Sequence, residues 1–249
     1  MTASTAASLS VAAENSLKNN VFGLFYFYMR SGAQVERTTA YLRDVYLPAV
    51  KRHDITAGFF SPVVGERSPY ILSLAAYPSW SGIEKLHFDM ADDKDFQKGW
   101  DAYNVIGDPA YERMEVVLLY AFDKIPVISV APAEGRQTSR IFELRIYESP
   151  SEKALARKIK MFEDGEAGIF KRLGMAPVFF GRNISGPRMP CLTYMLSFDD
   201  LAARDRLWRA FSSDPEWQKL RATPGLSDAE IVSNITNTIL RPLPFSMVR

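Results

Sequence analysis

Three polar residues alternate along one predicted β-strand in the second half of the sequence, and they form a candidate chemical site. Glu143, Arg145 and Tyr147 are separated by single residues, so their side chains point to the same face of a strand, about 7 Å apart. Charged groups on a covered face are costly unless they are paired or bind a ligand. In a ligand site, Arg145 would hold a carboxylate or enolate oxygen, Tyr147 would donate a hydrogen bond, and Glu143 would contact the same ligand. The alternative is a structural ion pair between two sheets.

A further candidate is Glu166, which interrupts an apolar stripe on the helix that follows this strand. The stripe consists of residues at helical spacing, Leu155, Ile159, Phe162, Ile169 and Leu173. A carboxylate that faces a core has a raised pKa and can act as a general base. Alternatively, Gly165 lets the helix shift, and Glu166 lies at the edge of the stripe, because glutamate is rarely fully buried.

The sequence offers few ligands for a metal ion or a haem. It contains two histidines, His53 and His87, and one cysteine, Cys191. Cys191 lies in an apolar run and is interpreted as a buried small side chain. His87 lies on a predicted helix and is interpreted as a half-exposed histidine of an amphipathic helix. The common nucleotide, phosphate and zinc motifs are absent from the sequence. We therefore expect no cofactor and no metal.

Composition narrows the possible partners. The 249 residues include 30 basic and 29 acidic side chains, for a formal net charge of +1. Such a balance gives no field that would attract nucleic acid. No run of eighteen apolar residues predicts a membrane span. Residues 1–20, rich in Ala, Ser and Thr, are expected to form a disordered leader. The sequence leaves the compartment open, because an export signal could have preceded Met1, and it leaves association with further copies open.

An internal repeat organises the rest of the sequence. Ala57-Gly58-Phe59-Phe60 resembles Pro177-Val178-Phe179-Phe180 at an offset of 120 residues, and Lys51-Arg52 resembles Lys171-Arg172 at the same offset. Asp95-Phe96-Gln97-Lys98 resembles Glu216-Trp217-Gln218-Lys219 at an offset of 121. Repetition at a nearly constant offset indicates two copies of one structural unit.

Each copy has the pattern of a ferredoxin-like β-α-β-β-α-β unit. We expect an N-terminal unit over 21–124, a linker over 125–139 and a C-terminal unit over 140–249. In the first copy, strands are predicted near 21–30, 57–64, 70–77 and 114–122, with helices at 35–53 and 81–103. In the second copy, strands are predicted near 140–148, 176–183, 190–198 and 235–241. The helix after the first of these is expected to begin at Ser149, with Pro150 at its first position and Glu152 completing a capping box. A second helix is expected to break near Asp214.

The faces of the two first strands suggest how the units pair. One group is expected to point into the space between two facing sheets: Tyr26, Tyr28, Arg30, Glu143, Arg145 and Tyr147. The intervening apolar residues are expected to pack beneath the helices: Phe25, Phe27, Phe142, Leu144 and Ile146. Pairing of the sheets covers aromatic faces that would be unfavourable in water. We thus predict an α+β fold in which two tandem units form an α/β barrel within one chain.

Several stretches of the second copy resemble the NIPSNAP family. They are Phe142-Glu143-Leu144-Arg145-Ile146-Tyr147-Glu148, Met161-Phe162-Glu163-Asp164-Gly165-Glu166 and Asp214-Pro215-Glu216-Trp217-Gln218-Lys219. The resemblance is dense over 140–246 and looser over 21–124. It implies the dimeric α/β-barrel group, which includes antibiotic-type monooxygenases, muconolactone isomerase-like proteins and haem-degrading enzymes. Members of that group that handle haem use a histidine on a helix, so the resemblance implies an axial haem ligand as the alternative role of His87. A fold of this kind does not by itself imply a reaction.

Two classes of function are consistent with these features. In the first, the space between the sheets binds a small, partly apolar, oxygenated molecule and supports cofactor-independent isomerisation or oxygenation. Arg145, Tyr147 and Glu166 would then be catalytic, and Tyr26, Tyr28, Arg30 and Glu143 would bind the ligand. In the second, the protein is a binding or interaction module without turnover.

Overall fold

The computed structural model describes residues 20–30, 32–65, 67–129 and 140–249. We call residues 20–129 the first half and residues 140–249 the second half. The predicted leader falls almost entirely outside the described residues, and so do residues 130–139 of the predicted linker. Within the described part of the chain, no helix is long and apolar enough to cross a membrane.

The two halves contain the same order of strands and helices, except that the second half has one more short helix, α9, before its last strand. The first half contains β1 (Val21–Tyr28), α1 (Ala33–Tyr41), the π-helix η1 (Leu42–Tyr46), α2 (Leu47–Arg52), β2 (Thr56–Val64), β3 (Tyr70–Tyr77), α3 (Trp80–Asp92), α4 (Lys94–Tyr103) and β4 (Arg113–Ala121). The second half contains β5 (Ile141–Glu148), α5 (Glu152–Met161), the π-helix η2 (Phe162–Glu166), α6 (Ala167–Arg172), β6 (Ala176–Asn183), β7 (Cys191–Phe198), α7 (Leu201–Ser213), α8 (Pro215–Arg221), α9 (Asp228–Ile231) and β8 (Asn234–Pro242).

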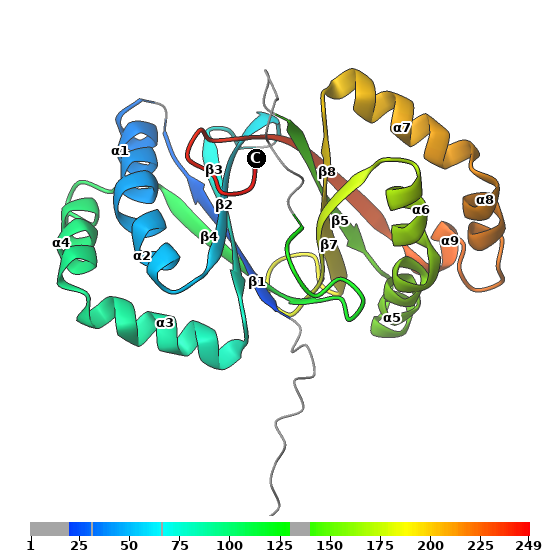
Figure 1. Ribbon diagram of the computed structural model, residues 1–249, viewed down its shortest axis with the longest axis horizontal. Helices are drawn as coiled ribbons and strands as arrows, with labels where there is room; N and C mark the ends of the chain where they lie inside the picture. The colour runs from blue at the N-terminus through cyan, green and yellow to red at the C-terminus, as the bar shows by residue number, and fades with distance from the viewer. Residues whose placement is uncertain (1–19, 31, 66, 130–139) are drawn as a thin grey trace, which may run out of the picture.

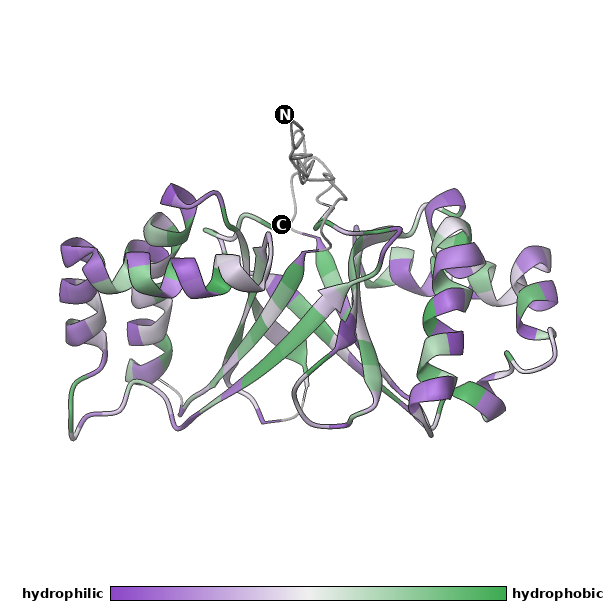
Figure 2. Ribbon diagram, turned by 90° about the horizontal axis from the view of Figure 1, so that it is seen from below, coloured by the Kyte–Doolittle hydropathy of each residue, from purple (hydrophilic) through white to green (hydrophobic). Residues whose placement is uncertain are grey.

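The eight strands form one closed antiparallel barrel, with helices on two opposite outer faces (Figures 1 and 2). The strand order is β1-β3-β2-β8-β5-β7-β6-β4. The halves meet at two seams, where β2 pairs with β8 and β4 pairs with β6. We expected two sheets that face each other; instead, their edges are hydrogen-bonded into a single sheet. Closure satisfies the edge strands that two separate sheets would expose.

Local sequence signals explain where most helices begin. Side chains of Ser79, Asp93, Asp200 and Asp214 accept hydrogen bonds from backbone N–H groups in the first turns of α3, α4, α7 and α8. The predicted break near Asp214 is confirmed, because α8 begins at Pro215.

The expected start of the helix after β5 was wrong by two residues. Ser151, not Ser149, caps α5 by accepting a hydrogen bond from the Ala154 N–H. Ser149 is instead buried and donates a hydrogen bond of 2.9 Å to the Ile231 carbonyl. Because the Ser149 hydroxyl bonds the Ile231 carbonyl, Ser149 does not cap the helix, and Ser151 caps it instead.

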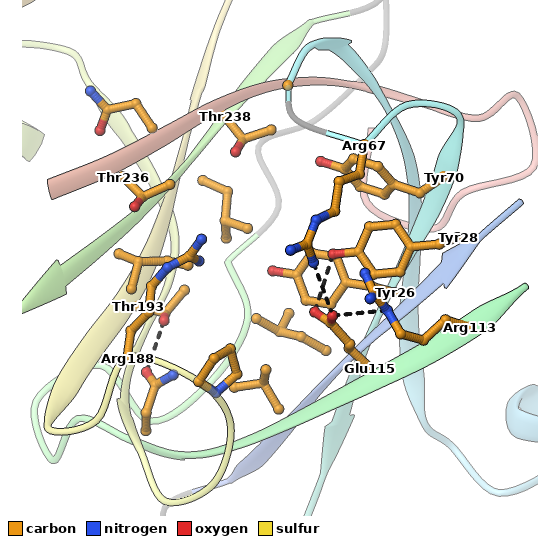
Figure 3. A pocket seen from close by; sticks show the side chains of 18 of the residues that line it. Tyr26, Tyr28, Arg67, Tyr70, Arg113, Glu115, Arg188, Thr193, Thr236 and Thr238 are labelled. Carbon is orange, nitrogen blue, oxygen red and sulfur yellow. Dashed lines mark hydrogen bonds and ion pairs between the residues drawn. The ribbon is translucent and has the colours of Figure 1, made fainter.

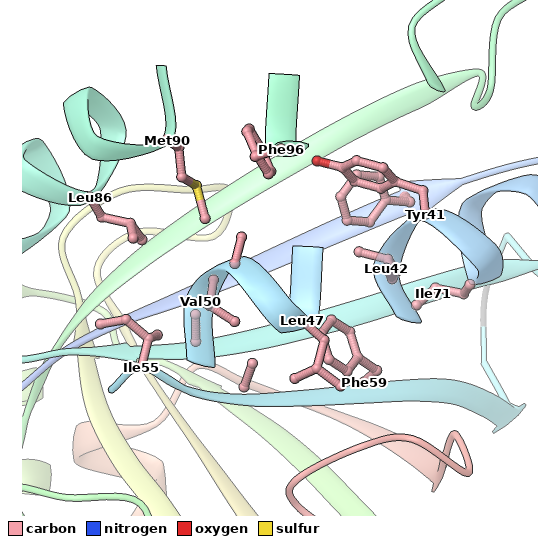
Figure 4. Packing of buried hydrophobic residues seen from close by; sticks show 14 of the residues in the cluster. Tyr41, Leu42, Leu47, Val50, Ile55, Phe59, Ile71, Leu86, Met90 and Phe96 are labelled. Carbon is pink, nitrogen blue, oxygen red and sulfur yellow. The ribbon is translucent and has the colours of Figure 1, made fainter. Parts of the chain in front are cut away.

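Three apolar clusters hold the protein together. One fills the barrel interior and includes Phe22, Leu24, Phe142 and Leu144. The second lies between the sheet and the helices of the first half (Figure 4). The third lies at the equivalent place in the second half. Because side chains alternate along each strand, every strand contributes to the interior with one face and to a helix-covered cluster with the other.

This alternation confirms our assignment for β1 and reverses it for β5. Phe25 and Phe27 pack beneath the helices, and Tyr26 and Tyr28 face the barrel interior. In β5 the interior residues are the apolar ones, Phe142 and Leu144 in the interior cluster and Ile146 at an interior cavity. Glu143, Arg145 and Tyr147 lie on the opposite face, beneath the helices of the second half. Arg30 lies beyond the end of β1 on the surface, paired with Glu112.

Candidate functional site

One end of the barrel interior is open and contains a cavity of about 650 Å³ (Figure 3). Tyrosines, threonines and arginines from both halves surround it. The polar lining consists of Tyr26, Tyr28, Arg67, Tyr70, Arg113, Glu115, Asn183, Arg188, Thr193, Thr236, Asn237 and Thr238. Leu24, Val117, Leu144 and Ile146 form an apolar floor. A concave space with an apolar floor and a few convergent polar groups is typical of a small-molecule site.

Two of the arginines enter the cavity from equivalent loops. Arg67 lies in the turn between β2 and β3, and Arg188 lies in the turn between β6 and β7, 121 residues later. Both have a left-handed backbone, with φ of 57° and 71°. Residues other than glycine rarely adopt this conformation, which costs about 1–3 kcal/mol and is concentrated at functional sites. The two hairpins thus present the same side chain to one cavity.

A compact charged cluster lies on one side of the cavity. The Glu115 carboxylate accepts a hydrogen bond of 3.2 Å from the Tyr28 hydroxyl. It also pairs with Arg113 at 3.1 Å and with Arg67 at 3.4 Å. The Arg113 guanidinium lies over the Tyr28 ring, 4.7 Å from its centre. Glu115 is therefore engaged by three neighbours and is not a free base.

Arg188 lies on the opposite side of the cavity (Figure 3). Its nearest carboxylate is that of Glu148, at a long 3.8 Å, and Glu148 also accepts a hydrogen bond of 2.8 Å from Asn234. Among the described lining residues, three guanidinium groups face one carboxylate. Even with Glu148 included, three positive charges stand against two negative ones, so the cavity has an excess of positive charge.

The tyrosines of the cavity wall remain protonated at neutral pH. Burial raises the pKa of Tyr70 to about 12. Burial also raises the pKa of Tyr26 and, together with the nearby Glu115, that of Tyr28. The rings of Tyr26 and Tyr28 are stacked, with centres 6.1 Å apart. These residues therefore offer flat apolar surfaces and hydroxyl donors, not anions.

The structure brings two of our predicted site residues, Tyr26 and Tyr28, to this cavity. Arg30 is exposed elsewhere. Glu143, Arg145, Tyr147 and Glu166 do not line this cavity, and they do not line the second cavity that is described below. Our placement of Glu143, Arg145 and Tyr147 in the barrel interior was wrong, because Phe142 and Leu144 fill that face of β5 instead.

Glu143 is the centre of a buried polar network between β5 and α7. Its carboxylate accepts hydrogen bonds from Arg145 Nη1 at 2.7 Å, from Arg204 at 2.7 and 2.9 Å, and from Trp208 Nε1 at 2.7 Å. Arg145 donates to the Tyr147 hydroxyl at 3.0 Å and lies over the Trp208 ring, 4.4 Å from its centre. The structural interpretation of this group is thus favoured. The ion pairs of Glu143 lie within β5 and between β5 and α7, however, and not between two sheets.

Glu166 is buried, so its placement at the edge of the stripe was wrong. The π-helix η2 ends at Glu166 and turns its side chain inward, where Lys158 Nζ donates a hydrogen bond of 3.0 Å. Burial raises the pKa of Glu166. Lys158 is also buried and lies 4.9 Å from the centre of the Phe162 ring. The carboxylate is paired and has no contact with either cavity, which favours a role in packing.

The four charged residues of the cavity escaped the sequence analysis: Arg67, Arg113, Glu115 and Arg188. One signal was available, because Arg67-Ser68-Pro69 and Arg188-Met189-Pro190 repeat at the offset of 121. Arg113 and Glu115 had no such signal, since their counterparts in the second half, Asn234 and Thr236, are uncharged.

His87 does not approach the barrel cavity. It is exposed on α3, at the edge of a second cavity of about 410 Å³ between α3, α4 and the sheet. No described lysine or arginine lines this cavity, although haem propionates need such partners. Within the described residues, no three His, Cys, Asp or Glu side chains are grouped to hold a metal ion.

We therefore expect haem titration to give no saturable one-to-one Soret spectrum. The absorbance change should be small, unsaturated and the same for the His87→Ala variant, because a single exposed imidazole is a weak anchor. A one-to-one spectrum that disappears in His87→Ala would contradict this prediction.

Two solved structures share the fold over at least 90% of both chains. A protein from Lactobacillus acidophilus NCFM, described as a "putative monooxygenase", is 11% identical, with a TM-score of 0.62; the alignment covers 90% of this chain and 94% of that one. An "anthrone oxidase-like protein" is 10% identical, with a TM-score of 0.53, and 92% and 93% of the two chains are covered. An uncharacterized NIPSNAP-like domain protein from Burkholderia xenovorans is 22% identical over 43% of this chain and 89% of its own, with a TM-score of 0.39. No curated protein matches.

The closed barrel with helices on its outer faces is a mixed α/β fold, and the first two of these structures share it. Residues 142–247 match the sequence model of the NIPSNAP family. The second half of the chain therefore contains a NIPSNAP domain.

Proposed function

We propose that the barrel cavity binds a small, partly apolar, oxygenated anion. The observation that carries this proposal is the pair of left-handed arginines, Arg67 and Arg188, which two equivalent hairpins direct into one space. An arginine held in a costly backbone conformation, with its carboxylate partner only at a long distance, is suited to a ligand that carries a carboxylate. Arg188 meets both conditions.

The rest of the cavity sets the shape of the ligand. Tyr26, Tyr28 and Tyr70 provide aromatic walls, and Leu144 and Ile146 provide an apolar floor. The volume of about 650 Å³ lies within the range of about 300–1,000 Å³ that is usual for small-molecule sites. An aromatic ring bearing a carboxylate or an enolate satisfies both parts of this lining.

We also propose that each half is a ferredoxin-like unit, with the linker over 125–139, so that the chain contains both partners of a dimeric barrel. The order of strands, β4-β1-β3-β2 in one half and β8-β5-β7-β6 in the other, supports this interpretation. The cavity then belongs to both units, because each contributes one of the two loop arginines.

Replacing Arg188 by methionine is expected to weaken the binding of salicylate by about ten- to a hundredfold, because a hydrogen bond to a charged group contributes about 1.5–3 kcal/mol. The measurement is isothermal titration calorimetry of the purified protein with salicylate and with the uncharged salicylamide. Arg67→Met should lower salicylate affinity in the same direction.

Arg182→Met is the matched control, because Arg182 is on the neighbouring strand β6 but pairs with Glu152 at the surface. This variant should bind salicylate as the unaltered protein does. Salicylate binding that survives both Arg67→Met and Arg188→Met would contradict the proposed site. Equal affinity for salicylate and salicylamide would contradict the requirement for an anion.

A second candidate function is cofactor-independent oxygenation or isomerisation in the same cavity. The descriptions of two similar structures, an "anthrone oxidase-like protein" and a "putative monooxygenase", favour it. Oxygen uptake in the presence of anthrone, reduced in Arg188→Met, would support this function. Binding of the ligand without any turnover would favour the alternative, a non-catalytic binding or interaction module. Roles of Arg145, Tyr147 and Glu166 in catalysis would require access from a cavity, so we propose that they stabilise the second half.

A further inference from the structure

The second cavity lies within the first half, on the outer side of the sheet. It is bounded by α3 and α4 on one side and by β1 and β3 on the other, next to the cluster of Figure 4. Leu42 and Met90 of that cluster form part of its wall. The volume of about 410 Å³ is sufficient for a molecule of two or three fused rings.

One polar atom in this cavity has no partner. Ser73 is 2% exposed, and its Oγ makes no hydrogen bond within the described protein. Its neighbours across the sheet, Phe25 and Phe59, have apolar side chains. A buried hydroxyl without a partner costs about 1–3 kcal/mol, so such groups call for an explanation. A ligand that bonds Ser73 would supply one.

The second half shows what the same space looks like when protein fills it. At the positions equivalent to Ser73 and His87, 121 residues later, it has Tyr194 and Trp208. Tyr194 is fully buried, and its hydroxyl donates to Tyr147 at 3.1 Å. Trp208 packs on Arg145. Smaller side chains in the first half leave the corresponding volume empty and the serine unpaired.

The lining determines the class of ligand. No described Asp, Glu, Lys or Arg lines the cavity, and aromatic rings from five elements surround it: Phe25, Tyr41, Tyr46, Tyr77, Phe96 and Trp100. Two polar side chains nearby are already engaged, since Gln97 donates to the Met90 carbonyl and Tyr103 bonds Thr38. An entering molecule therefore finds flat, mostly apolar walls, and the Ser73 hydroxyl is the one fully buried polar group of the described lining without a partner.

We propose that the first half binds an uncharged, planar aromatic molecule in this cavity, through one hydroxyl or carbonyl group that bonds Ser73. The site is separate from the anion site of the barrel, on the other face of the same strands. Ligands enter past the exposed rim formed by His87, Trp100 and Met114.

The test compares 1-naphthol with naphthalene, two probes that differ by one hydroxyl group. Equilibrium dialysis of the purified full chain gives both dissociation constants. Ser73→Ala is expected to weaken 1-naphthol binding about two- to tenfold, as the loss of one ordinary hydrogen bond predicts, and to leave naphthalene binding unchanged. His87→Trp places at the cavity rim the residue that the second half has at the equivalent position, Trp208. The larger side chain should fill part of the cavity and weaken the binding of both probes more than tenfold.

Two controls separate this site from others. Ser197→Ala removes a buried serine hydroxyl from β7 that lines neither cavity, and it should change neither probe. Arg188→Met alters the barrel cavity and should also change neither. The proposal is overturned if Ser73→Ala affects both probes equally or neither, if His87→Trp leaves binding intact, or if Arg188→Met abolishes it.

Discussion

Replacing Glu143 by alanine is expected to lower the free energy of unfolding by about 3–5 kcal/mol, the usual cost of removing one partner from a buried ion pair. Glu143 has no exposed surface, and Arg145 beside it is 8% exposed. Arg145 Nε already lacks a partner, and the substitution would also remove the carboxylate that binds its Nη1. Trp208 would lose its acceptor as well.

Urea unfolding, followed by circular dichroism, measures this loss. Glu152→Ala is the control, since Glu152 is exposed and pairs only with Arg182 at the surface; such pairs contribute about 0–1 kcal/mol. If Glu143→Ala lost as little stability as the control, the network would have no structural importance, and the polar side chains of β5 would need a functional explanation.

The same residue should contribute to the pH dependence of stability. Burial alone would raise the pKa of Glu143, but the hydrogen bonds from Arg204, the charge of Arg145 and the Trp208 N–H outweigh it, so the pKa is lowered. A carboxylate with a lowered folded pKa stabilises the fold above its unfolded value of about 4.3, and this contribution is lost as the pH falls toward the folded value. Glu143→Gln should therefore lose less stability on acidification than the unaltered protein.

Replacing Lys158 by methionine is the second substitution with a large expected effect, about 3–5 kcal/mol at pH 7. It leaves Glu166 in the core without its ammonium partner, at a position that is 1% exposed. Because burial already raises the pKa of Glu166, the carboxyl group is favoured in its protonated form. The stability that protonated Glu166 contributes is fully present below the unfolded pKa of this group and is lost as the pH rises through its folded pKa. The variant should thus be least destabilised near pH 4 and more so at pH 7.

The double variant Lys158→Met/Glu166→Leu should be more stable than Lys158→Met alone, because an apolar pair avoids the desolvation of both charges. The first half supports this expectation, since Thr38 and Tyr46 occupy the equivalent positions 120 residues earlier. Lys160→Met is the control, because Lys160 is an exposed residue of the same helix. A double variant no better than the single one would mean that the ion pair itself is needed there.

Hydrophobic periodicity predicted most elements because side chains alternate between the two faces of each strand and because each helix is covered on one side only. The strands at 70–77 and 176–183 were predicted to the residue. The assignment of faces failed on β5 because we treated Glu143 and Arg145 as the counterparts of Tyr26 and Tyr28. The two pairs are separated by 117 residues in the sequence, an odd number. The structural offset is 120, which makes Phe22 and Leu24 equivalent to Phe142 and Leu144. A shift by an odd number of residues exchanges the two faces of a strand.

The site was harder to predict than the fold. Alternating polar residues in a strand indicate that one covered face of the strand is polar. They do not indicate which of the two covered faces contains the cavity. Glu143 and Arg145 satisfied one another beneath a helix, whereas Arg67 and Arg188 came from turns, where an arginine is unremarkable. Their repeat at an offset of 121 marks the two arginines as equivalent. That both face one cavity is seen only when the two hairpins close over the same end of the barrel.

The joining of both halves in one chain has a consequence for how the protein can change over generations. When two identical chains build a barrel, every substitution appears twice, at both symmetry-related positions. In this chain a single gene position alters only one half, so Ser73 and Tyr194 can occupy equivalent places in one molecule. The second half contains a buried charged network and bulky rings, whereas the equivalent space of the first half is an apolar cavity. Two identical chains could not differ in this way at equivalent positions.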